Sequence, residues 1–386
     1  MRALPLKLLF VASALAFSQS NPPAAPPVWQ MQDSGTTAGL RGIDSVDGTV
    51  AWASGTGGTV LKTLDGGAHW TQCATPDAAK DGATLDFRGV QAWDANTAFV
   101  MSSGKGELSR LYKTKDGCKT WKLIIVNPDK DGFWDALKFE FEKYHKTYMG
   151  YGYILGDPVD GKFCLFIGGT FHNNWIKQKS NGLQADVETQ SVFAASNSSF
   201  NSQVSFPVFG SGGSGGAFIY SLTTRTVCLD DCPPEEMNLD GKDDEWTRES
   251  VPLGKSTNSS GVFSIGSRPA PSIYPLMAYV SVIVGGDYSN PNKTDYTAAY
   301  KNASAGQHWH ASTTPPHGFR SAVQWSEALK LWITVGTNGS DISRDDGKTW
   351  QPLDDGNWNA LSLPFVVGPN GRIARLNPAA LPVDKP

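Results

Sequence analysis

The chain has 386 residues, with 33 basic and 37 acidic side chains, a formal net charge of −4 and a pI near 5.9. This balance excludes the strongly basic surface on which nucleic-acid binding depends. Glycine (41 residues) and tryptophan (13) are abundant, and charged residues make up only 18% of the chain. That profile favours many short strands and tight turns over helices.

The N-terminal residues 1–20 have the pattern of a cleaved signal peptide. Arg2 and Lys7 flank the apolar run LLFVASALAF, and Ala16-Phe17-Ser18 offers a small-x-small cleavage site. This apolar run is too short to span a bilayer. Residues 21–27 follow as a spacer rich in proline and alanine. We therefore expect a secreted or periplasmic protein with no transmembrane segment in its mature chain.

A turn motif recurs three times further along the chain. The strings TLDGGAHW, TKDGCKTW and SRDDGKTW fit the Asp-box pattern Ser/Thr-x-Asp-x-Gly-x-x-Trp, with Cys118 in place of glycine in the second. The hydroxyl and the carboxylate can satisfy turn backbone groups that strand pairing leaves open, and glycine supplies a positive φ. The predicted structural residues are Thr63, Asp65, Gly67, Trp70, Thr114, Asp116, Trp121, Ser343, Asp345, Gly347 and Trp350.

Degenerate units between these copies complete a regular series. Seven tryptophans mark the units: Trp29, Trp70, Trp121, Trp175, Trp246, Trp309 and Trp350. Each unit opens with an apolar strand, such as LRGIDSV or FRGVQAW, and further strands follow. Four strands per unit predict an all-β fold, a seven-bladed β-propeller. The last unit supplies only three strands, so we expect the N-terminal strand VWQMQ to close it.

These units predict one propeller domain over residues 28–378, with an irregular insertion at about 229–245 and a tail at 379–386. A six-bladed ring with an irregular fourth unit is the alternative.

The segments GDPVDGKF, GGDY and VGPNGRIARLN, together with the Asp-boxes, resemble the photosystem II stability/assembly factor-like propellers, exported relatives of the bacterial-neuraminidase-repeat class. The resemblance runs from about Val28 to Asn377. It implies a propeller fold, and photosynthetic members bind an unassembled membrane-protein subunit through an arginine-lined face. The degenerate boxes at Trp175 and Trp309 and the insertion depart from the family pattern.

Three arginines recur at the start of predicted inner strands: Arg41, Arg88 and Arg320. Inner strands line the central channel of a propeller, and guanidinium groups suit carboxylates, so a C-terminal peptide or an acidic ligand is the expected partner. Trp134 and Asp135 are predicted to add an aromatic wall and a carboxylate in the third blade. The alternative is that each arginine bridges neighbouring blades through backbone carbonyls.

We predict a non-catalytic, monomeric binding propeller with a protein or peptide partner and no nucleic-acid partner. A sialidase-like glycoside hydrolase is one alternative, because the arginines could hold a substrate carboxylate. Such an enzyme must also bring two or three acidic groups to the channel mouth. A structural propeller without a discrete site is the other alternative, in which the arginines are engaged between blades.

No cofactor motif is present, and we expect neither a cofactor nor a metal site. Glu236-x-Asn238-x-Asp240-Gly241 imitates half of a calcium loop, but Thr247 stands where the loop requires glutamate. His308, His310 and His317 could together hold a metal. A solvated acidic loop and a turn-rich segment are the predictions for these two regions.

Five cysteines, an odd number, cannot all pair within one chain. A bridge between Cys228 and Cys232 is one alternative in an oxidising compartment, and five unpaired thiols are the other.

Overall fold

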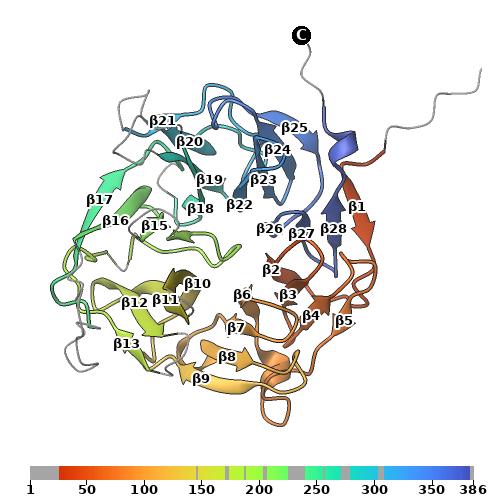
Figure 1. The fold of residues 1–386 in the computed structure, drawn as a ribbon. Helices are drawn as coiled ribbons and strands as arrows, with labels where there is room; N and C mark the ends of the chain where they lie inside the picture. Colours follow the sequence, from red (N-terminus) through yellow and green to blue (C-terminus); the bar gives the residue numbers. More distant parts are fainter. Residues whose placement is uncertain are drawn as a thin grey trace, which may run out of the picture.

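The computed structural model describes residues 26–144, 147–169, 174–186, 188–202, 207–224, 240–254, 257–270, 279–302 and 308–382. Seven four-stranded sheets stand around a common centre as the blades of a propeller (Figure 1). The predicted fold class and blade number are confirmed. The predicted signal peptide lies outside the described residues, as does most of the predicted spacer.

Blades one to three are built from consecutive strands, with the first strand innermost and the last at the rim (Figure 1). Blade one contains β2 (Leu40–Ser45), β3 (Ala51–Gly55), β4 (Val60–Thr63) and β5 (Thr71–Gln72). Blade two contains β6 (Phe87–Ala92), β7 (Ala98–Ser102), β8 (Arg110–Thr114) and β9 (Lys122–Val126). Blade three contains β10 (Trp134–Tyr144), β11 (Thr147–Val159), β12 (Lys162–Gly169) and β13 (Trp175–Lys177).

Blades four to six repeat this order. Blade four contains β14 (Phe200–Asn201), β15 (Val208–Ser211), β16 (Phe218–Thr224) and β17 (Glu245–Ser250). Blade five contains β18 (Ser260–Pro269), β19 (Tyr279–Asp287), β20 (Ala298–Lys301) and β21 (His310–Ala311). Blade six contains β22 (Ala322–Ser326), β23 (Leu331–Gly336), β24 (Gly339–Ser343) and β25 (Gln351–Asp354). Short 3-10 turns occur at η1 (Gly82–Thr84), η2 (Gly106–Leu108) and η4 (Pro378–Ala380).

Blade seven joins the two ends of the described chain. Its strands are β26 (Ala360–Ser362), β27 (Phe365–Val367) and β28 (Ile373–Leu376), followed at the rim by β1 (Trp29–Gln32). The register of β1 on β28 runs from Trp29 opposite Leu376 to Gln32 opposite Ile373. Trp29 is 4% exposed, and its indole N–H donates to Ser340 Oγ of blade six at 3.0 Å. The predicted closure by the N-terminal strand is confirmed.

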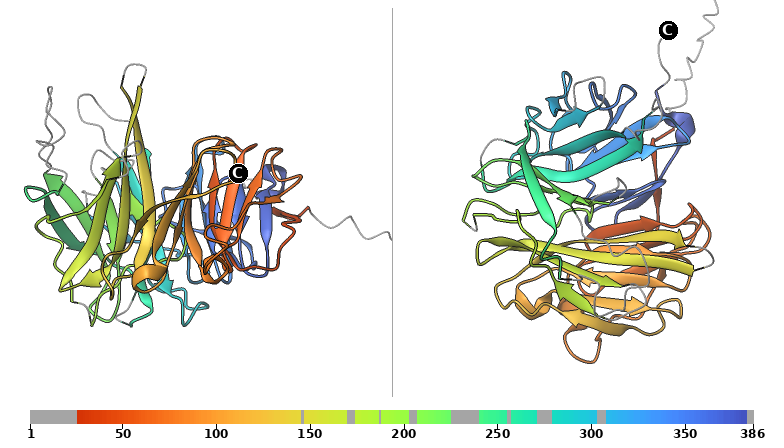
Figure 2. Two further views of the ribbon diagram at one scale, coloured as in Figure 1. Left: turned by 90° about the horizontal axis from the view of Figure 1, so that it is seen from below. Right: turned by 60° about the vertical axis from the view of Figure 1, so that its left-hand side comes forward.

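Apolar side chains of neighbouring sheets fill the space between the blades. Trp52 of blade one is fully buried in one cluster with Val90 and Tyr112 of blade two. The strands β10 and β11 are the longest, and their hairpin projects beyond one face of the ring (Figure 2). The last pair of this hairpin, Tyr144 opposite Thr147, lies at the far end of the strands from Asp135 and Asp157. No helix in the described part of the chain has the length and apolar character needed to cross a membrane.

The three turns predicted from the repeated motif share one set of hydrogen bonds. In the first, the Thr63 hydroxyl donates to the Asp65 carboxylate at 2.9 Å and accepts the Gly67 N–H at 2.9 Å. The same contacts recur around Thr114 and around Ser343. The fifth motif position has a φ of +87° at Gly67, +68° at Cys118 and +83° at Gly347. This left-handed backbone explains why glycine is favoured there.

Replacing Asp345 by alanine is expected to lower the free energy of unfolding by about 1–2 kcal/mol, because three turn donors, the Ser343 hydroxyl among them, lose their acceptor. The Asp345 carboxylate accepts the Thr349 N–H at 2.8 Å and the Thr349 hydroxyl at 2.6 Å. Urea denaturation measures the change. The exposed Glu107→Ala is the control, with an expected change within about 0.5 kcal/mol. Equal stability of the two variants would contradict a bracing role for Asp345.

A disulfide joins blades one and two. Cys73 follows β5 at the rim of blade one, and Cys118 stands in the turn before β9 of blade two, with 5.3 Å between their Cα atoms. Sequence reasoning considered a different pair, and Cys228 and Cys232 lie outside the described residues. Cys164 is buried and unpaired. The alternative of five unpaired thiols is wrong, since this bridge uses two of them.

Candidate ligand-binding site

A single position, repeated in all seven blades, defines the central site. A buried apolar residue is followed by a residue of variable chemistry, near the start of the inner strand in blades one, two, three and five and in the segment before it in blades four, six and seven. The seven pairs are Leu40-Arg41, Phe87-Arg88, Trp134-Asp135, Val192-Phe193, Val262-Phe263, Phe319-Arg320 and Trp358-Asn359. The first member of every pair is at most 3% exposed. The apolar residue is thus buried between blades, and in six of the seven pairs its neighbour lines the centre of the ring.

An irregularity of the inner strands helps to direct these side chains. The pairing of the first two strands skips one residue in four blades, and that residue is Arg41, Arg88, Asp135 or Phe263. A bulged residue has no cross-strand partner, and bulges commonly re-aim side chains next to binding sites. In these four blades the bulge therefore directs the side chain of the repeated position towards the central channel.

A cavity of about 530 Å³ opens at this end of the channel. Six of the seven repeated positions line it: Arg41, Arg88, Asp135, Phe193, Phe263 and Asn359. Further lining residues include Phe133, Asp157, Ser191, Tyr288, Phe319 and Thr337. Ligand sites of this volume are common in proteins.

Two arginines form the basic side of the cavity. The Arg88 Nε donates to Asp86 Oδ2 at 2.8 Å, and one terminal nitrogen donates to the Ala194 carbonyl at 3.2 Å. Arg41 Nε lies 4.0 Å from the other oxygen of Asp86. The side chains of Arg41 and Arg88 are 36% and 27% exposed. Burial and the positive charge of Arg88 lower the pKa of Arg41. Two guanidinium groups thus share one carboxylate, which leaves positive charge for an anionic ligand.

Two carboxyl groups of blade three lie beside these arginines. Asp135 is 2% exposed, and burial, reinforced by the negative charge of Asp157, raises its pKa well above the usual range. Burial also raises the pKa of Asp157 to about 6, although the carboxylate accepts the Val192 N–H at 3.0 Å. Two neighbouring buried carboxyls cannot easily both be ionised. Burial and mutual repulsion therefore favour the protonated form of at least one of these two carboxyls.

Aromatic rings form the opposite side. Phe193 and Phe263 stack with ring centroids 4.0 Å apart, and Phe319 meets Phe263 edge-on at 4.7 Å. Tyr288 packs its edge against the first two rings and is itself 53% exposed. These residues come from or border blades four to six. The cavity therefore presents charge on one side and an apolar surface on the other.

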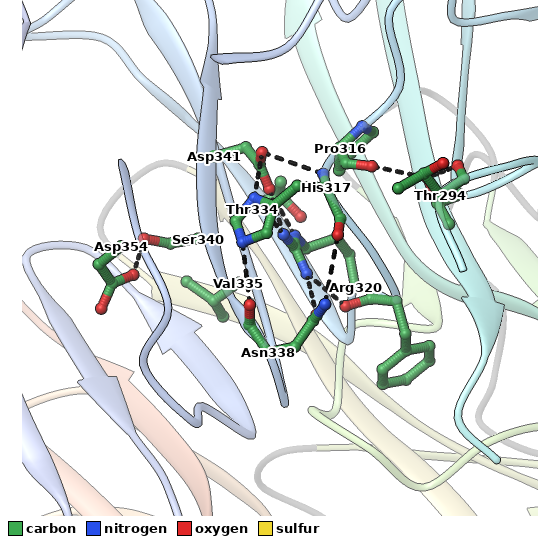
Figure 3. Close-up of polar contacts among 12 residues, drawn as sticks. Thr294, Pro316, His317, Arg320, Thr334, Val335, Asn338, Ser340, Asp341 and Asp354 are labelled. Carbon is green, nitrogen blue, oxygen red and sulfur yellow. Dashed lines mark hydrogen bonds and ion pairs between the residues drawn. The ribbon is translucent and has the colours of Figure 1, made fainter. Parts of the chain in front are cut away.

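Arg320 has a different environment from the other two arginines (Figure 3). Its side chain is 0% exposed and forms an ion pair with the buried Asp341, with Nε donating at 2.6 Å. It also donates to Asn338 Oδ1 at 2.7 Å and to the Phe319 carbonyl at 2.6 Å. His317 completes the cluster with Nδ1 2.8 Å from Asp341, and this hydrogen bond raises the pKa of His317. The predicted ligand contact by Arg320 is not what this geometry shows, because its guanidinium is saturated inside blade six.

Trp134 also differs from its predicted role as an aromatic wall. It is fully buried in the core between blades, where its ring lies 5.5 Å from that of Phe166. Side chains alternate along a strand, so Phe133 and Asp135 face the cavity while Trp134 faces the core. The predicted carboxylate at Asp135 does line the cavity, and Phe133 provides the ring.

The candidate metal ligands lie elsewhere. His317 belongs to the Arg320 cluster, and Asp240 forms an ion pair with Lys179 at 3.1 Å. Glu236 and Asn238 fall outside the described residues. Among the described residues, no group of three or more His, Cys, Asp or Glu side chains is arranged to hold a metal.

Sequence reasoning missed Asp157 and Tyr288 as site residues. Both lie in segments that carry the family resemblance, GDPVDGKF and GGDY. These segments end the second strands of blades three and five, beside the inner strands that carry Asp135 and Phe263. These two motifs, at the ends of the second strands, could have identified Asp157 and Tyr288 as candidate site residues.

Comparison with known proteins shows that the fold is shared at low sequence identity. A structure described as YCF48 bound to D1 peptide matches with a TM-score of 0.53 and 15% identity, over 92% of this chain and 99% of that one. YCF48 from Cyanidioschyzon merolae matches with 0.56 and 17%, over 91% and 99%. A structure of U3-55K matches with 0.52 and 12%, over 90% and 98%.

No protein-family model matches the chain, and no curated protein matches it in sequence. The predicted resemblance to assembly-factor propellers is thus supported by structure, at the level of the fold.

Proposed function

We propose that this chain is an exported, non-catalytic propeller that binds a protein or peptide through the central cavity, as a single chain and without a cofactor. The observation that carries the proposal is the pairing of Arg41 and Arg88 with an aromatic side across one cavity. A peptide segment with a carboxylate and an apolar side chain matches both sides. One structure of the same fold was solved with a D1 peptide, which supports a peptide as the ligand class.

The test is binding to a peptide library in which each sequence is present with a free C-terminal carboxylate and with a C-terminal amide. We expect the protein to select peptides with an apolar residue near a carboxylate. Arg41→Gln/Arg88→Gln is expected to weaken binding by about tenfold or more, because charged hydrogen bonds to the ligand are lost. The matched control is Arg248→Gln, on the outer strand β17 of blade four.

Binding that is unchanged in the double variant, or lost equally in Arg248→Gln, would contradict the proposed face. Absence of any selected peptide would contradict the peptide as ligand. Circular dichroism of each variant separates loss of binding from loss of fold.

A glycoside hydrolase is the second candidate, because acidic groups do converge beside the arginines. Asp157, ionised above its pKa of about 6, could act as base or nucleophile, while Asp135 stays protonated as an acid. We rank it second because only Arg41 and Arg88 of the three predicted arginines line the cavity, whereas the sialidase reading uses three arginines for the substrate carboxylate. Turnover of 4-methylumbelliferyl glycosides that is lost in Asp157→Asn would favour the enzyme. The third alternative, a propeller without a site, fits Arg320 but not Arg41.

A further inference from the structure

The carboxyl pair of blade three has an unusual setting. No cation lies within ion-pair distance of Asp135 or Asp157 among the residues that the structure describes. The charged groups facing Asp135 are Asp157 on β11 and Arg88 on β6, with Asp86 and Arg41 bordering the same space. Ionising both acids would place two negative charges in a poorly solvated site, which is costly. The pair is therefore held with at least one proton near neutral pH.

Several polar atoms around the cavity are buried without a hydrogen-bond partner in the described part of the chain. They are Asp135 Oδ2, Arg41 Nε and Thr337 Oγ1, none of which has a hydrogen-bond partner among the described residues. Buried polar atoms in native proteins are nearly always paired with protein, water or a ligand. The backbone N–H groups of Asp157 and Ala194 interact with the Asp135 carboxyl, and its Oδ2 has no hydrogen-bond partner within the described ranges, so Oδ2 is the oxygen available to carry the proton.

We propose that Asp135, in its neutral form, donates the O–H of Oδ2 to the carboxylate of the ligand, while Arg41 and Arg88 hold the same anionic group. This rests on the proposed function in one respect, that a peptide carboxylate is the natural ligand. A neutral carboxylic acid in an apolar site is a strong donor to an oxyanion. Asp135 is then a specificity-determining residue for carboxylates.

The affinity for a carboxylate ligand therefore depends on the protonation of this carboxyl pair. As the pH falls through about 6, Asp157 becomes neutral and one negative charge beside the ligand disappears. The charges that remain near the ligand are those of Arg41, Arg88 and Asp86. Since a carboxylic acid of ordinary pKa stays ionised at this pH, a carboxylate binds more tightly in mild acid. Removing one nearby like charge corresponds to about fivefold in affinity or more.

The experiment titrates 3-phenylpropanoate, which carries one ring and one carboxylate, into the full-length protein, followed by NMR at about pH 5.5 and about pH 8. Wild type is expected to bind about fivefold more tightly at the lower pH. Asp157→Asn is expected to bind equally at both. Asp135→Asn keeps a donor in the amide and should retain affinity within about threefold, whereas Asp135→Leu should lose about tenfold. The neutral 3-phenylpropanamide should show no pH dependence.

Asp44→Asn is the matched control, because this half-buried carboxyl accepts the Ala92 N–H at 2.7 Å and does not line the cavity. Tighter binding at the higher pH, equal loss in Asp135→Asn and Asp135→Leu, or no binding at either pH would overturn the proposal. Asp135→Asn is nearly isosteric, so it carries the test if Asp135→Leu fails to fold. If 3-phenylpropanoate binds as expected but no peptide is selected from the library, this inference stands and the proposed function fails. If peptides are selected but 3-phenylpropanoate does not bind as expected, the proposed function stands and this inference fails.

Discussion

Replacing Arg320 by alanine is expected to lower the free energy of unfolding by about 3–5 kcal/mol and to leave ligand binding unchanged. The reason is that Asp341 is fully buried and pairs through one oxygen with Arg320 and through the other with His317. Removing the guanidinium leaves a buried charge without its main partner and also removes the donor to Asn338. Urea denaturation measures the first effect, and titration of 3-phenylpropanoate measures the second.

A double variant distinguishes the two causes by which loss of Arg320 could destabilise the fold, the unpaired buried charge and the lost packing. Arg320→Leu/Asp341→Leu is expected to be more stable than Arg320→Leu alone, because removing both partners of a buried ion pair costs less than removing one. The exposed Lys330→Ala is the surface control, with a change within about 0.5 kcal/mol. If Arg320→Ala changes stability only slightly but loses ligand binding, Arg320 contacts the ligand, as the sequence analysis predicted.

Removing the disulfide between blades one and two is expected to lower the free energy of unfolding by about 4 kcal/mol in the chain-entropy estimate. Cys73 and Cys118 are 45 residues apart, so the bridge restricts a long loop of the unfolded chain. Cys73→Ser/Cys118→Ser, compared with wild type in urea, measures the change. Wild type treated with reductant should match the double variant.

Cys118 allows a sharper comparison, because its φ of +68° is one that glycine adopts without strain. Cys73→Ser/Cys118→Gly should be more stable than Cys73→Ser/Cys118→Ser by about 1 kcal/mol. The two other turns already have Gly67 and Gly347 at this position. Equal stability of the oxidised and reduced wild type would show that the bridge adds nothing to the fold.

The sequence allowed the architecture to be predicted because the blades repeat. Trp70, Trp121 and Trp350 each stand directly before an outermost strand, so their spacing measures the blade. The sequence also showed that the last unit lacks a fourth strand, and β1 supplies that strand in the structure. Such features depend on local pattern and on the need to bury sheet edges.

The chemistry of the site was only partly predictable, since it depends on one-residue register and on partners distant in sequence. Reading the third unit from Phe133 placed Trp134 at the cavity, whereas Trp134 packs in the core between blades and Asp135 is the member of the pair that lines the cavity. Arg320 has the same sequence context as Arg88, and only the presence of Asp341 on β24 draws it into the interior. Spacing within a unit cannot reveal a partner supplied by another strand.

The closure of blade seven links ring formation to the ligand site. During synthesis β1 emerges first, and its partner β28 follows more than three hundred residues later, from Trp29 to Leu376. Because closing so long a loop has a large entropic cost, we expect this pairing to form late in folding. Until then the cavity lacks a completed wall, because Asn359 of blade seven is one of its lining residues. We expect a ligand that bridges Arg41 of blade one and the aromatic residues of blades four to six to bind the closed ring more tightly than the open one, and by mass action such a ligand favours closure.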